Sequence, residues 1–186
     1  PPPEALVYST AIENDNPDFV NAPPGTARLH RSEAMRLLVQ KCSSPVFAVT
    51  GSCGKTTVSA WLAETLDRVG ASPALISGGL AKHFIRDGFA GNYAPGSGKL
   101  CVLEADESDK SLLNYSADHA MILNIGTDHY SKEELADVFR RFLLQTRVSA
   151  VLEDRVLEAV GTDCIRHLNT ALFSTDPDAP AELHGH

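Results

Sequence analysis

The chain has 186 residues, a formal net charge of −8 and 43% hydrophobic residues, which indicates one domain, or one domain and a fragment of another, with a real core. The negative charge argues against a nucleic-acid partner, because a phosphate backbone needs a basic surface. No apolar run approaches the roughly 18 residues that span a bilayer, and the N-terminus has no basic segment followed by an apolar one, so we expect neither a membrane segment nor a signal peptide.

The four cysteines are scattered and form no C-x-x-C pair. We therefore expect neither a disulfide framework nor a zinc site, and a reducing, cytoplasmic compartment.

The first part of the chain has few regular features. A strand-like run at residues 5–10 follows three prolines and has no obvious neighbour to pair with, so we expect that upstream sequence is missing. Residues 13–28 are rich in Asn, Asp and Pro and predict a loop. Ser32 is expected to cap a short helix whose inward-facing residues are Ala34, Leu37 and Leu38.

From residue 46 onward, predicted strands and helices alternate. A strand at 46–50 leads into a helix at 56–69, which ends before Gly70. The apolar face of this helix is predicted to consist of Val58, Trp61, Leu62, Leu66 and Val69. Further strands are predicted at 73–76, 100–103, 120–125 and 150–152, and the glycine-rich stretch 78–98 predicts a loop.

A second helix is predicted directly after Ser131, because Ser131 and Glu134 have the spacing of a capping box. Its apolar residues, at helical spacing, are Leu135, Val138, Phe139, Phe142 and Leu143. The tail from Phe173 onward shows no clear element. The strands at 100–103 and 120–125 are apolar almost throughout, which is typical of burial on both faces of a parallel sheet. We therefore predict an α/β fold with a mostly parallel sheet flanked by helices, of the phosphate-loop type.

The segment from Gly51 to Thr57 reads G-S-C-G-K-T-T and lies between the predicted strand and helix. A loop for ATP phosphates needs small residues whose N–H groups reach the oxygens, a lysine for the β- and γ-phosphates, and a hydroxyl for Mg²⁺. Gly51 and Gly54 meet the first need, Lys55 the second and Thr56 the third. Only two residues separate the glycines, so this is a variant of the common motif, unless Thr50 opens the loop.

The alternative is an ordinary strand–turn–helix connection. It is disfavoured because G-K-T-T stands at a helix N-terminus, where the helix dipole attracts anions. We expect the side chain of Lys55 to face solvent.

Four carboxylates follow the strand at 100–103, namely Glu104, Asp106, Glu107 and Asp109. So many like charges are unfavourable together unless solvent or a cation relieves them. Mg²⁺ prefers oxygen ligands, usually one or two carboxylates with phosphates completing the shell. Glu104, nearest the strand, is the predicted ligand. The alternative is a solvated acidic turn.

His129 follows the strand at 120–125, and its neighbour Asp128 could orient the imidazole ring. A lone histidine is more often a surface or core residue, and only the other two motifs favour a functional role for this one. Because ligands collect at the carboxyl ends of parallel strands, we expect all three motifs to converge on one polyphosphate.

The three motifs, residues 51–57, 104–109 and 124–129, resemble the central ATPase domain of the Mur ligases, which are ATP-dependent amino-acid ligases of peptidoglycan precursor synthesis. The string E-A-D-E-S-D is most similar to the branch that joins L-alanine to UDP-N-acetylmuramate, which also includes the ligase that recycles murein tripeptide. Residues 8–12, 16–17 and 29–35 resemble the end of that branch's UDP-binding domain. The resemblance extends from about Leu6 to Val160. It implies a remnant of the UDP-binding domain at 1–43 and the central ATP-binding domain at 44–186, with the C-terminal domain absent.

The resemblance also implies a mechanism in which ATP phosphorylates a substrate carboxylate and the amino group of an amino acid then displaces phosphate. The catalytic residues it implies are Lys55, Glu104 and His129, where Thr56 and Glu104 would hold one Mg²⁺ and His129 a second. The residues it implies in ATP binding are Gly51, Ser52, Cys53, Gly54, Lys55, Thr56, Thr57 and Asn124. Those it implies in substrate binding are Ser9, Thr10 and Glu107.

The sequence departs from the family pattern at two places. Cys53 stands where this branch usually has His, and the loop after His129 is shorter than usual, so substrate choice and rate are open. Nothing matches the carbamylated lysine of some relatives, and Lys132 is not assigned that role.

We expect the chain alone to bind Mg-nucleotide weakly and to ligate little, with missing domains or a partner subunit required. Two alternatives stay open: a non-catalytic nucleotide-binding module that works with a partner, and a related ligase acting on folate, cyanophycin or poly-glutamate, against which the E-A-D-E-S-D string speaks.

Overall fold

The computed structural model describes residues 3–9, 11–41, 45–97, 99–127, 130–174, 176, 178 and 181–184. The chain forms two compact units, residues 1–41 and 42–186. Within the described part, none of the helices combines the length and the apolar character that crossing a lipid bilayer requires.

The first unit contains a two-stranded parallel sheet and two helices. Strands β1 (Ala5–Tyr8) and β2 (Ala27–His30) pair in parallel, and helices α1 (Pro17–Val20) and α2 (Arg31–Lys41) follow them in turn. The prediction of a continuous loop at 13–28 was therefore wrong, because that stretch contains α1 and the start of β2.

Aromatic and apolar contacts fix these short elements in the first unit. The rings of Tyr8 and Phe19 meet edge to face with centroids 5.2 Å apart. In α2 the buried residue is Val39, whereas Leu38 is 56% exposed, which corrects its predicted inward orientation.

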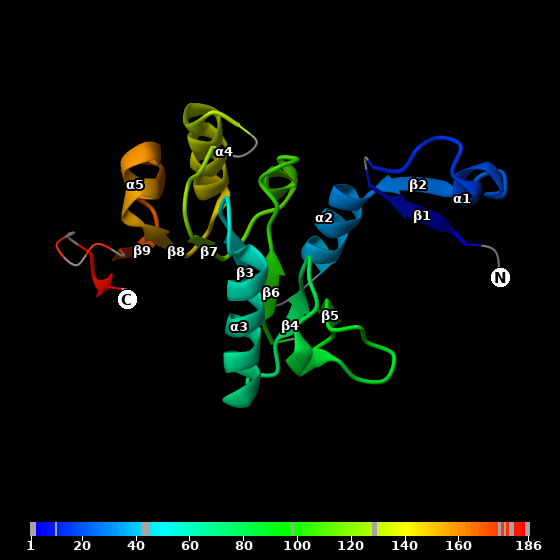
Figure 1. Cartoon of the computed structure of the whole chain (residues 1–186), viewed down its shortest axis with the longest axis horizontal. Coiled ribbons are helices and arrows are strands. Elements are labelled where there is room, and N and C mark those ends of the chain that lie inside the picture. Colours follow the sequence, from blue (N-terminus) through cyan, green and yellow to red (C-terminus); the bar gives the residue numbers. More distant parts are fainter. Residues whose placement is uncertain are drawn as a thin grey trace. The chain divides into compact units, whose positions relative to one another are not determined.

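An eight-stranded sheet forms the centre of the second unit, in the order β10-β9-β8-β7-β3-β6-β4-β5 (Figure 1). The strands are β3 (Val46–Thr50), β4 (Ala74–Ile76), β5 (Tyr93–Ala94), β6 (Cys101–Glu104), β7 (His119–Ile122), β8 (Ser149–Glu153), β9 (Asn169–Ser174) and β10 (Leu183–His184). All pairings are parallel except that of β4 with β5. The predicted fold class, a mostly parallel sheet flanked by helices, is confirmed. Strand β3 lies between β6 and β7, so three predicted motifs begin on adjacent strands.

Three helices accompany this sheet, α3 (Lys55–Arg68), α4 (Lys132–Gln145) and α5 (Asp154–Val160), together with the 3₁₀ turns η1 (Lys82–Phe84), η2 (Ser111–Asn114) and η3 (Asp163–Ile165). The capping box at the start of α4 is confirmed, since Ser131 and Glu134 bond each other's backbone N–H groups. All five apolar residues predicted to face inward from α4 are buried.

Helix α3 packs differently from the prediction. Trp61 is 66% exposed and Val69 75% exposed, while the buried residues of the helix are Ser59 and Ala63. Small side chains allow the helix to lie close to the sheet, where Ala63 joins a cluster with Leu75, Val102 and others. The predicted apolar face is therefore wrong for Trp61 and Val69, whereas Leu62 and Leu66 pack against this cluster as predicted.

Burial along the sheet also varies. In β6, Cys101, Val102 and Leu103 are all buried, as predicted for a strand covered on both faces. In β7 the burial alternates, since Ala120 and Ile122 are buried whereas His119 and Met121 are only half-buried. Along β7, the described residues thus fully cover only one face of the sheet.

Candidate functional site

The loop between β3 and α3 depends on glycine at two positions. Gly51 has φ 138° and Gly54 has φ 83°, both in the region that favours glycine. A Cβ on Gly51 would lie 3.1 Å from Cβ of Leu123, so the loop also packs too tightly there for a larger residue. Gly54 is the N-cap of α3, so no side chain caps the first N–H groups of this 14-residue helix, which remain available to an anion.

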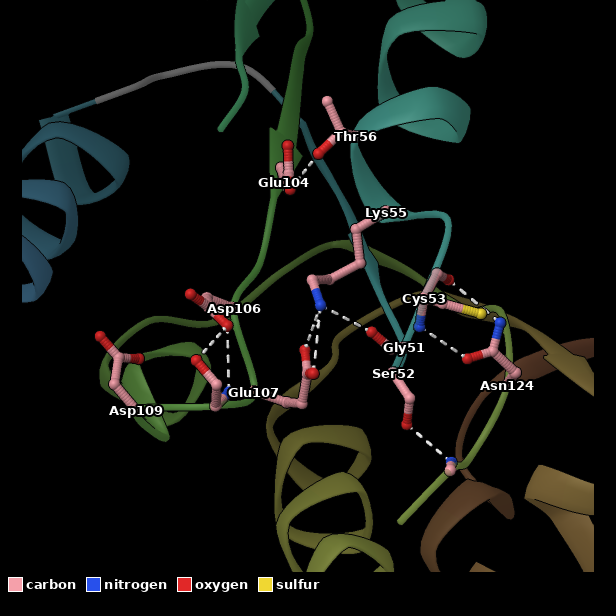
Figure 2. A network of polar contacts seen from close by, with 12 residues as sticks. Gly51, Ser52, Cys53, Lys55, Thr56, Glu104, Asp106, Glu107, Asp109 and Asn124 are labelled. Atoms are coloured by element: carbon pink, nitrogen blue, oxygen red, sulfur yellow. Dashed lines mark hydrogen bonds and ion pairs between the residues drawn. The ribbon is translucent and has the colours of Figure 1, made fainter. Parts of the chain in front are cut away.

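The segment that follows β7 holds the loop in shape. The side chain of Asn124 accepts from the N–H of Cys53 at 3.0 Å and donates to the carbonyl of Cys53 at 3.0 Å. The hydroxyl of Ser52 accepts from the N–H of Gly126 at 2.6 Å. Asn124 therefore supports the loop through its backbone, as Figure 2 shows.

Lys55 points back over the loop. Its Nζ donates to the carbonyl of Gly51 at 2.9 Å and to Oε1 of Glu107 at 3.1 Å, and it lies 2.9 Å from Oε2 of Glu107. The side chains of Lys55 and Glu107 are 17% and 4% exposed. The expectation that Lys55 faces solvent was wrong, because a buried carboxylate draws its ammonium inward.

Thr56 and Glu104 meet on the other side of the helix start. The hydroxyl of Thr56 donates to Oε1 of Glu104 at 2.7 Å. Oε2 of Glu104 accepts from the hydroxyl of Ser77 at 2.9 Å and from the N–H of Gly78 at 2.6 Å. Glu104 is therefore held in one orientation by donors from α3 and from the end of β4.

The other carboxylates of the acidic string each have their own donors. Asp106 accepts from the N–H and hydroxyl of Ser108 at 3.0 Å and 2.8 Å, and Asp109 accepts from the N–H of Ser111 at 2.8 Å. The hydroxyl of Tyr130 donates to the carbonyl of Ser108 at 2.6 Å. Each of the four acidic residues thus has protein partners of its own.

The pair of Thr56 and Glu104 fits a magnesium ion. Adjacent oxygens in an octahedral Mg²⁺ shell, at about 2.0–2.1 Å from the metal, lie about 2.9 Å apart. The hydroxyl of Thr56 and Oε1 of Glu104 are 2.7 Å apart, and each has lone pairs left to coordinate an ion. Among the described residues, no group of three or more His, Cys, Asp or Glu residues could hold a metal, so phosphate and water oxygens would complete such a shell.

The structure brings most of the predicted site residues of the second unit together. Lys55, Thr56, Glu104, Glu107 and Asn124 all lie at the carboxyl ends of β3, β6 and β7 (Figure 2). Their roles in binding and catalysis stay predictions, as does that of Thr57, which is exposed in the first turn of α3.

Four further residues complete the set named from the sequence. Ser9 is half-buried in the first unit, where its carbonyl accepts from the N–H of Ile12 at 3.1 Å. Thr10, Asp128 and His129 lie outside the described residues.

Sequence reasoning missed two of the groups that hold Glu104. Ser77 and Gly78 directly follow β4, which pairs in parallel with β6, so their donors lie beside the end of that strand. The string S-G-G after a predicted strand was a signal that could have found them.

A second polar cluster lies at the carboxyl ends of β8 and β9. Burial, followed by the hydrogen bond and charge of Asp154, raises the pKa of Glu153. The hydrogen bond from the hydroxyl of Ser174, at 2.8 Å, is the main cause that lowers the pKa of Asp154. Within this pair, the two shifts favour protonation of Glu153 before Asp154.

The parallel sheet, the glycine loop at the start of α3 and the adjoining lysine, threonine and glutamate define an α/β protein of the phosphate-loop type. No family model matches the sequence. The chain is, however, 38% identical over 144 residues to UDP-N-acetylmuramate–L-alanine ligase from Clavibacter michiganensis subsp. michiganensis (strain NCPPB 382), an overlap of 75% of this chain and 29% of that protein. The ligase of the same name from Synechococcus sp. (strain CC9311) is 33% identical over an alignment of 191 positions, gaps included. This alignment covers 97% of this chain and 37% of that ligase.

A solved structure agrees with these relatives. UDP-N-acetylmuramate–alanine ligase from Thermotoga maritima superposes with a TM-score of 0.74 at 26% identity, over 92% of this chain and 38% of that chain. By sequence and by fold, the chain is therefore homologous to a part of the Mur ligases. It spans roughly a third of the length of the curated relatives that it matches, between 29% and 37% for the two above.

Proposed function

We propose that this chain provides the nucleotide-binding part of an ATP-dependent ligase that joins an amino acid, L-alanine, to UDP-N-acetylmuramate through an acyl phosphate. One observation carries the proposal. Lys55, Thr56 and Glu104, from the loop and from the neighbouring strand, surround the start of α3 in the arrangement that binding a Mg-polyphosphate requires.

The residues have distinct roles in this proposal. The N–H groups of the loop and of the first turn of α3 bind phosphate oxygens, and the ammonium of Lys55 stabilises the charge that develops on the transferred phosphoryl group. Asn124 keeps the loop N–H groups convergent. Thr56 and Glu104 would hold Mg²⁺, which when bound offsets the negative charge of the phosphates.

Nucleotide binding is the first test of the proposal. Calorimetric titration with a non-hydrolysable ATP analogue and Mg²⁺ should show binding by the natural chain and none by Lys55→Ala. The matched control is Lys99→Ala, which removes an exposed lysine and should bind as the natural chain does. Equal affinity of the Lys55→Ala protein would contradict the assignment of Lys55.

Ligation is the second test. With the remaining ligase domains supplied, release of phosphate from ATP should require both UDP-N-acetylmuramate and an amino acid, with L-alanine preferred over glycine, L-serine and D-alanine. Phosphate release that ignores UDP-N-acetylmuramate would contradict the proposed substrate.

One observation favours a second candidate, a nucleotide-binding module without ligase chemistry of its own. The side chain of Cys53 is exposed in the middle of the phosphate loop, where this family branch usually has histidine. Tight binding of Mg-nucleotide, without phosphate release under any substrate combination even when the remaining ligase domains are supplied, would support this candidate.

A further inference from the structure

We infer that Glu107 occupies the place of a phosphoryl group on Lys55 in the nucleotide-free protein, and that it thereby makes nucleotide binding depend on Mg²⁺. This inference rests on the proposed function of the same site. It assigns Glu107 a positioning role toward Lys55, in place of the substrate contact that the sequence predicted for it.

The contacts of Lys55 support this assignment. A lysine ammonium has three N–H donors, of which the carbonyl of Gly51 takes one and Oε1 of Glu107 another. Oε2 of Glu107 lies only 2.9 Å from Nζ but outside hydrogen-bond geometry, so its attraction to the ammonium is purely electrostatic. The third donor is left for a phosphate oxygen, which must then share the charge of the ammonium with Glu107.

Burial makes the pair electrostatically strong. Glu107 as a residue is 3% exposed, so solvent screens its charge poorly and Lys55 is the cation closest to it among the described contacts. Oε2 of Glu107 has no hydrogen-bond donor in the described part of the chain, which leaves an acceptor that is almost fully buried and directed at the lysine. Removing Lys55 from this carboxylate without replacing its charge is therefore unfavourable.

The same charge repels an incoming polyphosphate. A phosphate oxygen in contact with Nζ would lie within about 6 Å of the carboxylate of Glu107, since each would be about 3 Å from the same ammonium. Like charges at this separation in a poorly solvated site disfavour each other. Glu104, which is fixed by Thr56 and Ser77, adds a second negative charge beside the residue that follows Lys55.

A divalent cation removes this penalty. With Mg²⁺ beside Thr56 and Glu104, the polyphosphate arrives with less net charge, so Lys55 can be shared between it and Glu107. Free nucleotide has no such compensation. Glu107 thus discriminates against nucleotide without metal, and against other bare polyanions such as pyrophosphate.

The test compares affinities with and without metal. The dissociation constant of a non-hydrolysable ATP analogue is measured by calorimetry for the natural chain and for Glu107→Gln, in excess Mg²⁺ and in EDTA. In EDTA the variant should bind about tenfold more tightly than the natural chain, because the amide keeps the shape and loses the charge. In excess Mg²⁺ the dissociation constants of the variant and of the natural chain should differ by less than about threefold.

Asp109→Asn is the matched control. It removes one negative charge from the same acidic string, and its amide oxygen can still accept from the N–H of Ser111. Its affinities should match those of the natural chain in both conditions. If Glu107→Gln binds the analogue equally or more weakly in EDTA, Glu107 supports Lys55 in the bound state and the inference is overturned.

A double-mutant cycle tests the pair without any nucleotide. The free energy of unfolding is measured for the natural chain, Lys55→Met, Glu107→Gln and the double variant. Each single substitution should lower the free energy of unfolding by more than half of the loss that the double substitution causes. The reason is that each leaves the other member of the pair buried without its partner. Additive effects would overturn the inference. If Glu107→Gln does not fold, Glu107→Ala gives the same comparison.

A wrong proposed function and a wrong role for Glu107 give different combinations of results in the affinity measurements and the double-mutant cycle. If the natural chain binds the analogue in neither condition while the cycle shows coupling, nucleotide binding is refuted and the Lys55–Glu107 pair stands. If the natural chain binds and the ratio of its affinities in Mg²⁺ and EDTA is unchanged by Glu107→Gln, only the role of Glu107 is refuted.

Discussion

The hydroxyl of Thr56 donates a 2.7 Å hydrogen bond to Oε1 of Glu104, and so joins the first turn of α3 to the last residue of β6. The second carboxylate oxygen of Glu104 is bonded by Ser77 and Gly78, which follow β4. Three chain segments thus fix this carboxylate beside the phosphate loop before any ligand arrives. Fixed groups lose little conformational freedom on binding, which favours affinity.

Glu104→Ala should abolish the effect of Mg²⁺ on nucleotide affinity, because it removes the charged oxygen that would coordinate the ion. The measurement is a titration of Mg²⁺ at constant concentration of a non-hydrolysable ATP analogue. Glu158→Ala, at an exposed position in α5, is the control and should keep the natural response. A response of Glu104→Ala identical to that of the natural chain would remove Glu104 from the metal site.

Gly79→Ala should weaken nucleotide binding by about tenfold, which corresponds to about 1.4 kcal/mol. A Cβ at Gly79 would lie 2.5 Å from Cγ2 of Thr56, so the threonine must rotate and its hydroxyl must leave Glu104. Adding Thr56→Ser removes the obstructing methyl group and keeps the hydroxyl, so the double variant should regain most of the affinity. Failure of this rescue would show that Gly79→Ala acts through the backbone.

Asn124→Ala should lower the free energy of unfolding by about 1–2 kcal/mol, because it removes both hydrogen bonds to Cys53. Nucleotide affinity should fall as well, since the loop N–H groups are no longer held together. Urea denaturation and calorimetry measure the two effects. Asn114→Ala, at an exposed position, is the control, and equal behaviour of the two variants would exclude a clamping role for Asn124.

Glu153→Gln should change the pH dependence of stability. Burial raises the pKa of Glu153 above its ordinary 4.5, so the folded protein binds this proton more tightly than the unfolded chain does. The stability that this proton contributes is complete below pH 4.5 and is lost as the pH rises through the folded pKa. The variant should therefore be more stable than the natural chain at pH 7, and this advantage should disappear toward low pH.

Urea denaturation between about pH 3.5 and pH 8 measures this difference. The partner Arg155 is 64% exposed, so its loss as an ion pair should matter little. Glu158→Gln, at an exposed position in α5, serves as control. An advantage of Glu153→Gln that is independent of pH would mean that packing, rather than the carboxyl proton, causes it.

The parts of the fold that the sequence predicted well have strong local signals. The capping box and the apolar spacing of α4 predicted both its start and its buried face, because the pattern arises within one helix. Trp61 in α3 was misplaced, because the side of α3 that packs on the sheet is set by close approach at Ser59 and Ala63. Elements such as α5 and β9 were missed because they are short or lack a clear period.

The site was predictable in its outline and not in its contacts. The rule that ligands collect at the carboxyl ends of parallel strands was enough to bring Lys55, Thr56 and Glu104 together. The pairing of Lys55 with Glu107 could not be anticipated, because it joins residues 52 positions apart and depends on the turn that follows β6. Such contacts are set by tertiary structure and leave no periodic trace in the sequence.

The hydrogen bonds between Cys53 and Asn124 span 71 positions of the chain. At a translation rate of about 5–20 residues per second, a ribosome needs roughly 4–14 s to make Asn124 after it has made Cys53. During that interval the glycine segment lacks its clamp, and the flanking strands β6 and β7 are made only in the later part of it. Under the proposed function, nucleotide therefore cannot assist the early stages of folding, and a nascent chain gains its binding site only when the middle of the sheet closes.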